Sequence, residues 1–111
     1  MAHYFFISTG LRGAYLSDNG YFVKVNSRKE LKAYVEAEFN DIKDAGYCIS
    51  KKELVSSVAD IWRNLKAARR SPYPFVVSYG FRHGYSANKC NAIHIMHATK
   101  AEYDEFMESE Q

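Results

Sequence analysis

Apolar residues recur at helical spacing in a long segment near the middle of the chain. This segment contains Leu31, Val35, Phe39 and Ile42, which lie three or four residues apart and would line one side of a helix. Gly46 follows the segment, and glycine is common just beyond a helix because it adopts the left-handed conformation without strain. We therefore expect a first helix over residues 28–45.

A second segment has an apolar stripe wide enough to face a core, made of Leu54, Val58, Ile61, Trp62 and Leu65. Arg69 and Arg70 come next, at a place where cations suit the end of a helix, and Pro72 and Pro74 prevent the helix from continuing. The segment predicts a second helix that begins after Ser50 and carries the two arginines in its last turn.

Three segments share a pattern that begins helices, a Ser or Thr followed three residues later by Glu. The pairs are Ser27 with Glu30, Ser50 with Glu53, and Thr99 with Glu102. In such a capping box the hydroxyl accepts a hydrogen bond from the backbone N–H three residues on, and the glutamate reaches back to the N–H of the cap. The third pair predicts a short helix from about Lys100, with Tyr103, Phe106 and Met107 on one face.

Four runs of β-branched and aromatic residues predict strands at residues 3–9, 21–25, 75–81 and 91–98. Turn-forming residues precede the second run, so we expect Tyr15 and Leu16 to pair with residues 21–23 as a small hairpin. The predicted element order is β-β-α-α-β-β-α. This order indicates an α+β fold, with a single antiparallel sheet of about four strands and three helices mainly on one face.

The chain has 111 residues, the usual size of one domain, so we expect residues 1–111 to form a single compact α+β domain. Its longest uncharged stretches span 11 residues, whereas a membrane helix needs about 20 apolar residues. The N-terminus lacks the basic leader and cleavage site of a secretory signal. Cys48 and Cys90 form no Cys-x-x-Cys pair, which favours free thiols. These features predict a cytoplasmic protein that does not enter a membrane.

Charge is separated along the chain, although the net charge is only +2. Residues 61–101 contain seven Lys or Arg and no Asp or Glu, whereas residues 102–111 contain five acidic residues and no basic one. The candidate basic surface consists of Arg69, Arg70, Tyr73, Arg82, His83, Tyr85 and Lys89. The candidate acidic surface consists of Glu102, Asp104, Glu105 and Glu108. Each patch would be felt by a partner within a Debye length of about 10 Å.

Aromatic residues interleave with the basic segment, as they do in proteins that bind single-stranded nucleic acid. Trp62, Phe75, Tyr79 and Phe81 are more simply explained as core residues, because they lie on apolar faces of predicted elements. Tyr73 and Tyr85 are the better surface candidates. A secondary loop, residues 9–13, contains two glycines and Arg12 and is compatible with an anion, but glycine turn chemistry explains it more simply.

No motif predicts catalysis or a bound metal. His94 and His97 are three residues apart on a predicted strand, so they point to opposite faces and cannot chelate one ion together. His3 and His94 would meet only across neighbouring strands, without a third ligand. Cys90 lies near His94, but the spacing neither excludes nor supports a nucleophile pair. We therefore expect no cofactor, no metal and no catalytic residue.

Two classes of function fit these features. We expect first a small non-enzymatic binding or inhibitor protein whose charged surface acts on a host protein or a protein–nucleic-acid complex. In a generic way the chain resembles the accessory and inhibitor proteins of phages and other mobile elements, anti-CRISPR proteins among them. The acidic helix would then imitate a phosphate backbone, and exposed strand edges permit a homodimer.

The alternative class is an RNA- or DNA-binding protein, or a metal-independent RNase toxin. The order strand-helix-helix-strand-strand-helix resembles that of the RelE/ParE-type bacterial toxins. That resemblance implies roles in RNA cleavage for Arg82, His83, Tyr85 and Lys89. The modest net charge, the extra strand before the first helix and the acidic C-terminal helix depart from it.

Overall fold

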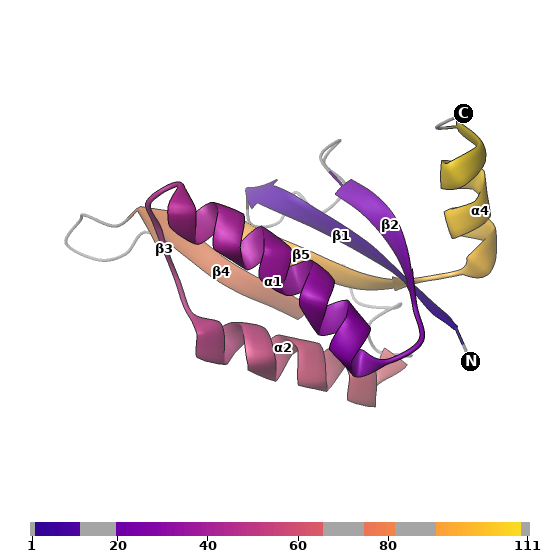
Figure 1. Ribbon diagram of the computed structural model, residues 1–111, viewed down its shortest axis with the longest axis horizontal. Coiled ribbons are helices and arrows are strands. Elements are labelled where there is room, and N and C mark those ends of the chain that lie inside the picture. The colour runs from indigo at the N-terminus through magenta and orange to yellow at the C-terminus, as the bar shows by residue number, and fades with distance from the viewer. Residues whose placement is uncertain (1, 12–19, 66–74, 82–90, 110–111) are drawn as a thin grey trace.

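The computed structural model describes residues 2–11, 20–65, 75–81 and 91–109, which form one antiparallel sheet and three helices (Figure 1). In chain order the elements are β1 (His3–Leu11), β2 (Gly20–Val25), α1 (Arg28–Asp44), β3 (Tyr47–Ile49), α2 (Lys51–Arg63), β4 (Phe75–Phe81), β5 (Asn91–Ala98) and α4 (Lys100–Ser109). The strands are arranged in the order β2-β1-β5-β4-β3, so β5 is central and β2 and β3 are the edges. The α+β fold with one antiparallel sheet is therefore confirmed.

The sheet contains five strands rather than about four, because β3 was not predicted. Tyr47–Ile49 pairs with the end of β4, with Ile49 opposite Tyr79. The strand occupies the short space between Gly46, which follows the C-cap of α1 at Ala45, and the N-cap of α2 at Ser50. Three residues are too few for an alternating pattern to be recognised, so only the pairing with β4 defines this strand.

The core lies between one face of the sheet and the helices α1 and α2, which run across that face in Figure 1. All four apolar positions that predicted the first helix are buried, and they are Leu31, Val35, Phe39 and Ile42. On the sheet, Phe5 and Ile7 of β1 lie opposite His97 and Ile95 of β5, and both apolar β1 residues are fully buried. The alternation of strand side chains thus places Phe5 and Ile7 of β1 together in the core.

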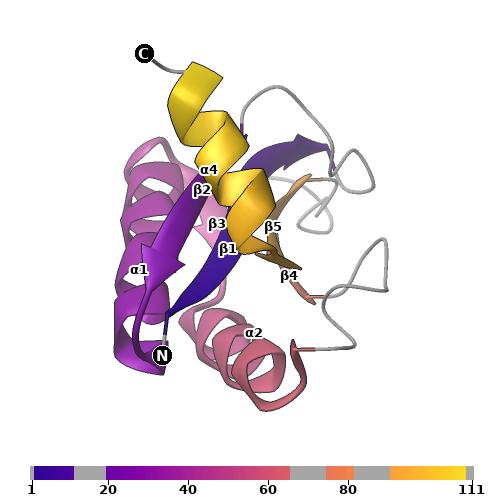
Figure 2. The ribbon, with the colours of Figure 1, turned by 90° about the vertical axis from the view of Figure 1, so that its right-hand side faces the viewer.

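Helix α4 packs against the opposite face of the sheet, near β2. Its contacts are with Tyr4 and Phe22, which alternate with the core residues Phe5 and Val23. Figure 2 shows α4 standing apart from α1 and α2. The prediction that the helices lie mainly on one face therefore fits two of the three.

The three predicted helix starts are confirmed, but their glutamates have different partners. The hydroxyls of Ser27 and Ser50 each accept the N–H three residues on at 3.2 Å, and that of Thr99 does so at 3.1 Å. Only the last pair is reciprocal, since Glu102 Oε1 accepts the Thr99 N–H at 2.9 Å. Glu30 instead accepts the N–H of Asn26 at 2.7 Å.

Glu53 binds outside its own helix. Its Oε1 accepts the backbone N–H of Ser78 at 2.9 Å, although the two residues are 25 positions apart. Ser78 lies on β4, one residue before the segment that pairs with β3. The carboxylate therefore satisfies a backbone donor of β4 at the point where the short edge strand ends.

Other predicted boundaries changed. Residues 9–11, assigned to a glycine loop, belong to β1 and pair with β5, which places the first part of that loop in the sheet. Tyr15 and Leu16 of the expected hairpin lie outside the described residues, and residues 21–23 pair with β1. Helix α2 ends at Arg63, with Asn64 as its C-cap, and Arg69 and Arg70, which were expected in its last turn, lie outside the described residues. Within the described residues, no helix is long and apolar enough to cross a membrane.

Candidate binding surface on helix α4

The candidate basic surface lies outside the described residues. Its residues are Arg69, Arg70, Tyr73, Arg82, His83, Tyr85 and Lys89. Arg12 of the secondary loop lies outside the described residues as well. Two cations of the basic segment are described, and each is paired with a neighbouring carboxylate. Arg63 Nη1 lies 3.5 Å from Asp60 Oδ1, and Lys100 Nζ lies 2.7 Å from Asp104 Oδ2.

The predicted acidic surface is described and lies on α4. Glu102, Glu105 and Glu108 are exposed, whereas Asp104 is partly buried and bound to Lys100. Glu102 also caps its own helix through Thr99. Among the described residues, Glu105 and Glu108 have neither a hydrogen bond nor an ion pair, so their carboxylates are free to meet a partner.

Helix α4 is attached to the sheet by aromatic rings. The Tyr103 ring lies 5.1 Å from that of Tyr4, and the Phe106 ring lies 5.3 Å from that of Phe22. None of the described α4 residues is fully buried. Met107, expected on the same apolar face, is 37% exposed, whereas Tyr103 and Phe106 make ring contacts with the sheet.

The ring of Phe22 is itself supported from β1. Phe6 lies opposite Phe22 in the register of β1 and β2, and their ring centroids are 4.8 Å apart. The Phe6 ring occupies the space that a Cβ at Gly20 would need. Gly20 therefore leaves room for the Phe6 ring, which is tilted by 58° to that of Phe22, and the two rings form an aromatic platform under α4.

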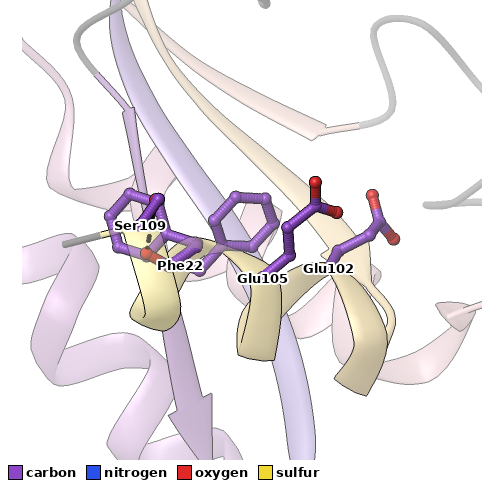
Figure 3. Close-up of a pocket in the computed structure, with 5 residues that line it drawn as sticks. Phe22, Glu102, Glu105 and Ser109 are labelled. Carbon is purple, nitrogen blue, oxygen red and sulfur yellow. Dashed lines mark hydrogen bonds between the residues drawn. The ribbon is translucent and has the colours of Figure 1, made fainter. Parts of the chain in front are cut away.

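A shallow hollow of about 360 Å³ lies where α4 meets β2 (Figure 3). It is lined by Phe22, Glu102, Glu105, Phe106 and Ser109. Figure 3 shows the side chains of Glu102 and Glu105 projecting from α4 in the same direction. The hydroxyl of Ser109 donates to the Phe106 carbonyl at 2.8 Å, which holds it at the last turn of the helix. The hollow thus combines aromatic faces with two carboxylates.

From the sequence, His3 and His94 could meet across neighbouring strands, but the structure places His3 elsewhere. His3 approaches His97 rather than His94, with ring centroids 6.2 Å apart, because His97 and His3 share the face that packs on α2. Trp62 lies against His3 at 5.0 Å. His94 lies on the other face, as its three-residue spacing from His97 predicts. No group of three or more His, Cys, Asp or Glu within the described part of the chain is placed to hold a metal ion.

His94 is a buried residue, only 1% exposed, on the central strand β5. Burial lowers the pKa of its imidazole below the ordinary value of 6.5, and the nearby backbone of Ser8, which lies opposite it on β1, partly opposes this effect. The expected neighbour Cys90 lies outside the described residues, and Cys48 is an exposed free thiol on β3.

The hollow was not predicted from the sequence, although its parts carried a signal. Alternation along β1 and β2 places Tyr4, Phe6 and Phe22 on the face away from the core. Three large rings on an outer face would be exposed to water unless another element packed on them. Tyr103 and Phe106 give the acidic helix rings that can pack on them.

Comparison with family models, with curated proteins and with solved structures gave no significant match. We therefore infer function from the chemistry of the described residues alone.

Proposed function

We propose that this protein is a small non-enzymatic binding protein whose working part is the carboxylate-bearing surface of α4. Its partner is a protein with a basic surface, of the kind that otherwise holds nucleic acid. The proposed activity is of the kind carried out by accessory and inhibitor proteins of phages and mobile elements, anti-CRISPR proteins among them.

The observation that carries the proposal is the placement of unpaired carboxylates where they cost the helix stability. The last turns of α1 and α2 contain Lys43 and Arg63, as expected for the negative end of a helix dipole. The last turn of α4 contains Glu108 and no basic residue. Glu102, Glu105 and Glu108 are also spaced three apart, and like charges at this spacing repel one another.

Helix α1 also has Asp41 and Asp44 in its last turn, but Lys43 lies between them, whereas the last turn of α4 has no basic residue to offset Glu108. Such local departures from the rules of helix stability are expected where a residue serves function rather than folding. A basic partner would remove the repulsion, because each unpaired carboxylate would gain an opposite charge. Carboxylates three residues apart are separated by about 4.5 Å along a helix axis. Each strand of a nucleic acid duplex presents one charge per roughly 3.4 Å of its axis, a comparable density.

The proposal is tested by removing the two free charges. The double variant Glu105→Gln/Glu108→Gln and wild type are used as bait in a bacterial lysate, and the captured proteins are eluted with duplex oligonucleotide. We expect wild type to retain a stoichiometric protein that the duplex displaces, and the double variant to lose it. Both substitutions keep the length of the side chain, and Glu102 is left in place because it caps the helix.

The matched control removes the same charge from another helix end. Asp41 and Asp44 are exposed on α1, so Asp41→Asn/Asp44→Asn should retain the partner. Equal loss with both double variants would show a nonspecific effect of net charge and would contradict the proposal. Retention by the α4 variant, or a partner that the duplex does not displace, would contradict it as well.

A further inference from the structure

The hollow beside α4 has a composition that selects one kind of ligand group. Two Phe rings line it together with two carboxylates, and within the described part of the chain no Lys or Arg is among its lining residues. Ring faces attract cations, and carboxylates attract them more strongly, so the two features act in the same direction. A volume of about 360 Å³ lies at the low end of ligand sites and suits a single side chain rather than a large molecule.

The chain leaves these carboxylates uncompensated. Lys100 is the described cation of α4, and it is bound to Asp104 at 2.7 Å. Glu102 uses Oε1 for the backbone and hydroxyl of Thr99. Glu105 has no described partner at all. An incoming cation would therefore not have to displace an existing ion pair from either glutamate.

The composition of the hollow favours one kind of cation over the others. A divalent metal requires a shell of oxygen ligands, whereas half of this site is aromatic. An ammonium group is a compact, strongly hydrated charge. A guanidinium group is planar and weakly hydrated, stacks on rings and donates in parallel to carboxylates. The hollow therefore suits a guanidinium group, because its rings can stack on the plane of that group and its carboxylates can accept hydrogen bonds from it.

We propose that this hollow binds the guanidinium group of an arginine side chain from the partner protein, stacked on Phe22 and Phe106 and hydrogen-bonded to Glu105 and Glu102. The inference rests on the proposed function and adds to it a single anchoring contact. Arginine is enriched among the few residues that dominate binding at protein interfaces. The acidic surface of α4 would provide attraction, and the hollow would fix the position of the partner.

The test uses two tripeptides, acetyl-Gly-Arg-Gly-amide and its Lys counterpart, titrated into the full chain and followed by NMR. We expect the Arg peptide to shift resonances of Phe22, Phe106 and Glu105, and the Lys peptide to bind more weakly. Glu105→Gln should weaken binding of the Arg peptide by roughly fivefold, as expected for a partly exposed ion pair. Phe22→Leu should reduce the preference for Arg over Lys, which loss of charge alone would not do.

The matched control is Glu108→Gln, which removes the same charge from the same helix at a position that does not line the hollow. It should leave binding of the Arg peptide within about twofold of wild type. Equal binding of both peptides, or equal effects of the two Glu variants, would overturn the inference.

Failure of the inference is distinguishable from failure of the proposed function. If the Arg peptide does not bind in the hollow but the α4 double variant still loses the captured partner, only the inference is wrong. If the Arg peptide binds but capture does not depend on α4, the proposed function is wrong.

Discussion

At the scale of single residues, one short motif produces three different arrangements. The Ser or Thr of each motif caps its helix, because that bond joins groups three residues apart. The second bond depends on what else lies near the glutamate carboxylate. For Glu53 this is the N–H of Ser78, on a strand that the chain reaches only after α2. Local sequence determines the first bond, and tertiary structure determines the second.

Glu53→Ala tests the importance of that long-range bond. Ser78 is 5% exposed, so its N–H would be left buried without an acceptor. We expect the free energy of unfolding to fall by about 2 kcal/mol, the usual cost of an unsatisfied buried donor. Urea denaturation gives the measurement. Glu30→Ala is the matched control, because its carboxylate accepts an exposed N–H and its loss should cost about 0.5–1 kcal/mol. Equal losses in the two variants would contradict the structural role of Glu53.

At the scale of elements, the sequence predicts helices and strands that have a periodic apolar pattern, and it misses a short strand that is defined only by its pairing. The four apolar positions that predicted α1 are all buried, since a helix that covers a core must repeat its contacts every turn. Strand β3 has three residues and no period of its own, so it is recognised only from its pairing with β4. The existence of α4 follows from Thr99 and Glu102, whereas its place on the outer face depends on rings from β1 and β2.

The candidate site illustrates the same limit. Its acidic residues are adjacent in the chain and were predicted as a surface. Phe22 lies far from Phe106 in sequence, so the hollow between them requires the register of β1 and β2 and the docking of α4. A binding site assembled from two elements cannot be recognised from the sequence of either element alone.

Attachment of α4 by two ring pairs predicts that it undocks more easily than the sheet opens. In Tyr103→Ala, which loses the contact with Tyr4, we expect amide hydrogens of α4 to exchange roughly tenfold faster while those of β1 and β5 are unchanged. A helix of ten residues is not stable in water by itself, so undocking and unfolding of α4 coincide. Hydrogen exchange followed by NMR measures both regions at once.

The matched control on the same helix is Met107→Ala, because Met107 is a large apolar residue that is 37% exposed. Exchange in α4 should change little in that variant. Faster exchange throughout the sheet in Tyr103→Ala would mean that α4 is part of the cooperative core, contrary to this prediction.

At the scale of the whole molecule, the two faces of the sheet have different roles. One face and the helices α1 and α2 enclose the core, so that face contributes most of the stability. The other face holds α4 at the β2 edge and, on the central strand, the buried His94. The exposed carboxylates of Glu105 and Glu108 lie on α4, the helix that has no buried residue among those described. The outer face can therefore carry a binding surface without weakening the inner one.

Because His94 is buried on the central strand, its protonation is coupled to the stability of the entire sheet. The unfolded chain binds a proton at the ordinary pKa of 6.5, whereas burial lowers the pKa in the folded protein. The unfolded state therefore holds more protons below about pH 6.5, and the free energy of unfolding falls as the pH decreases through that range. Above it, this contribution to stability is complete. Urea denaturation of wild type and His94→Leu between about pH 7.5 and pH 5 tests the coupling, with pH dependence expected to be steeper in wild type. Parallel curves for the two proteins would show that proton binding at His94 does not limit stability.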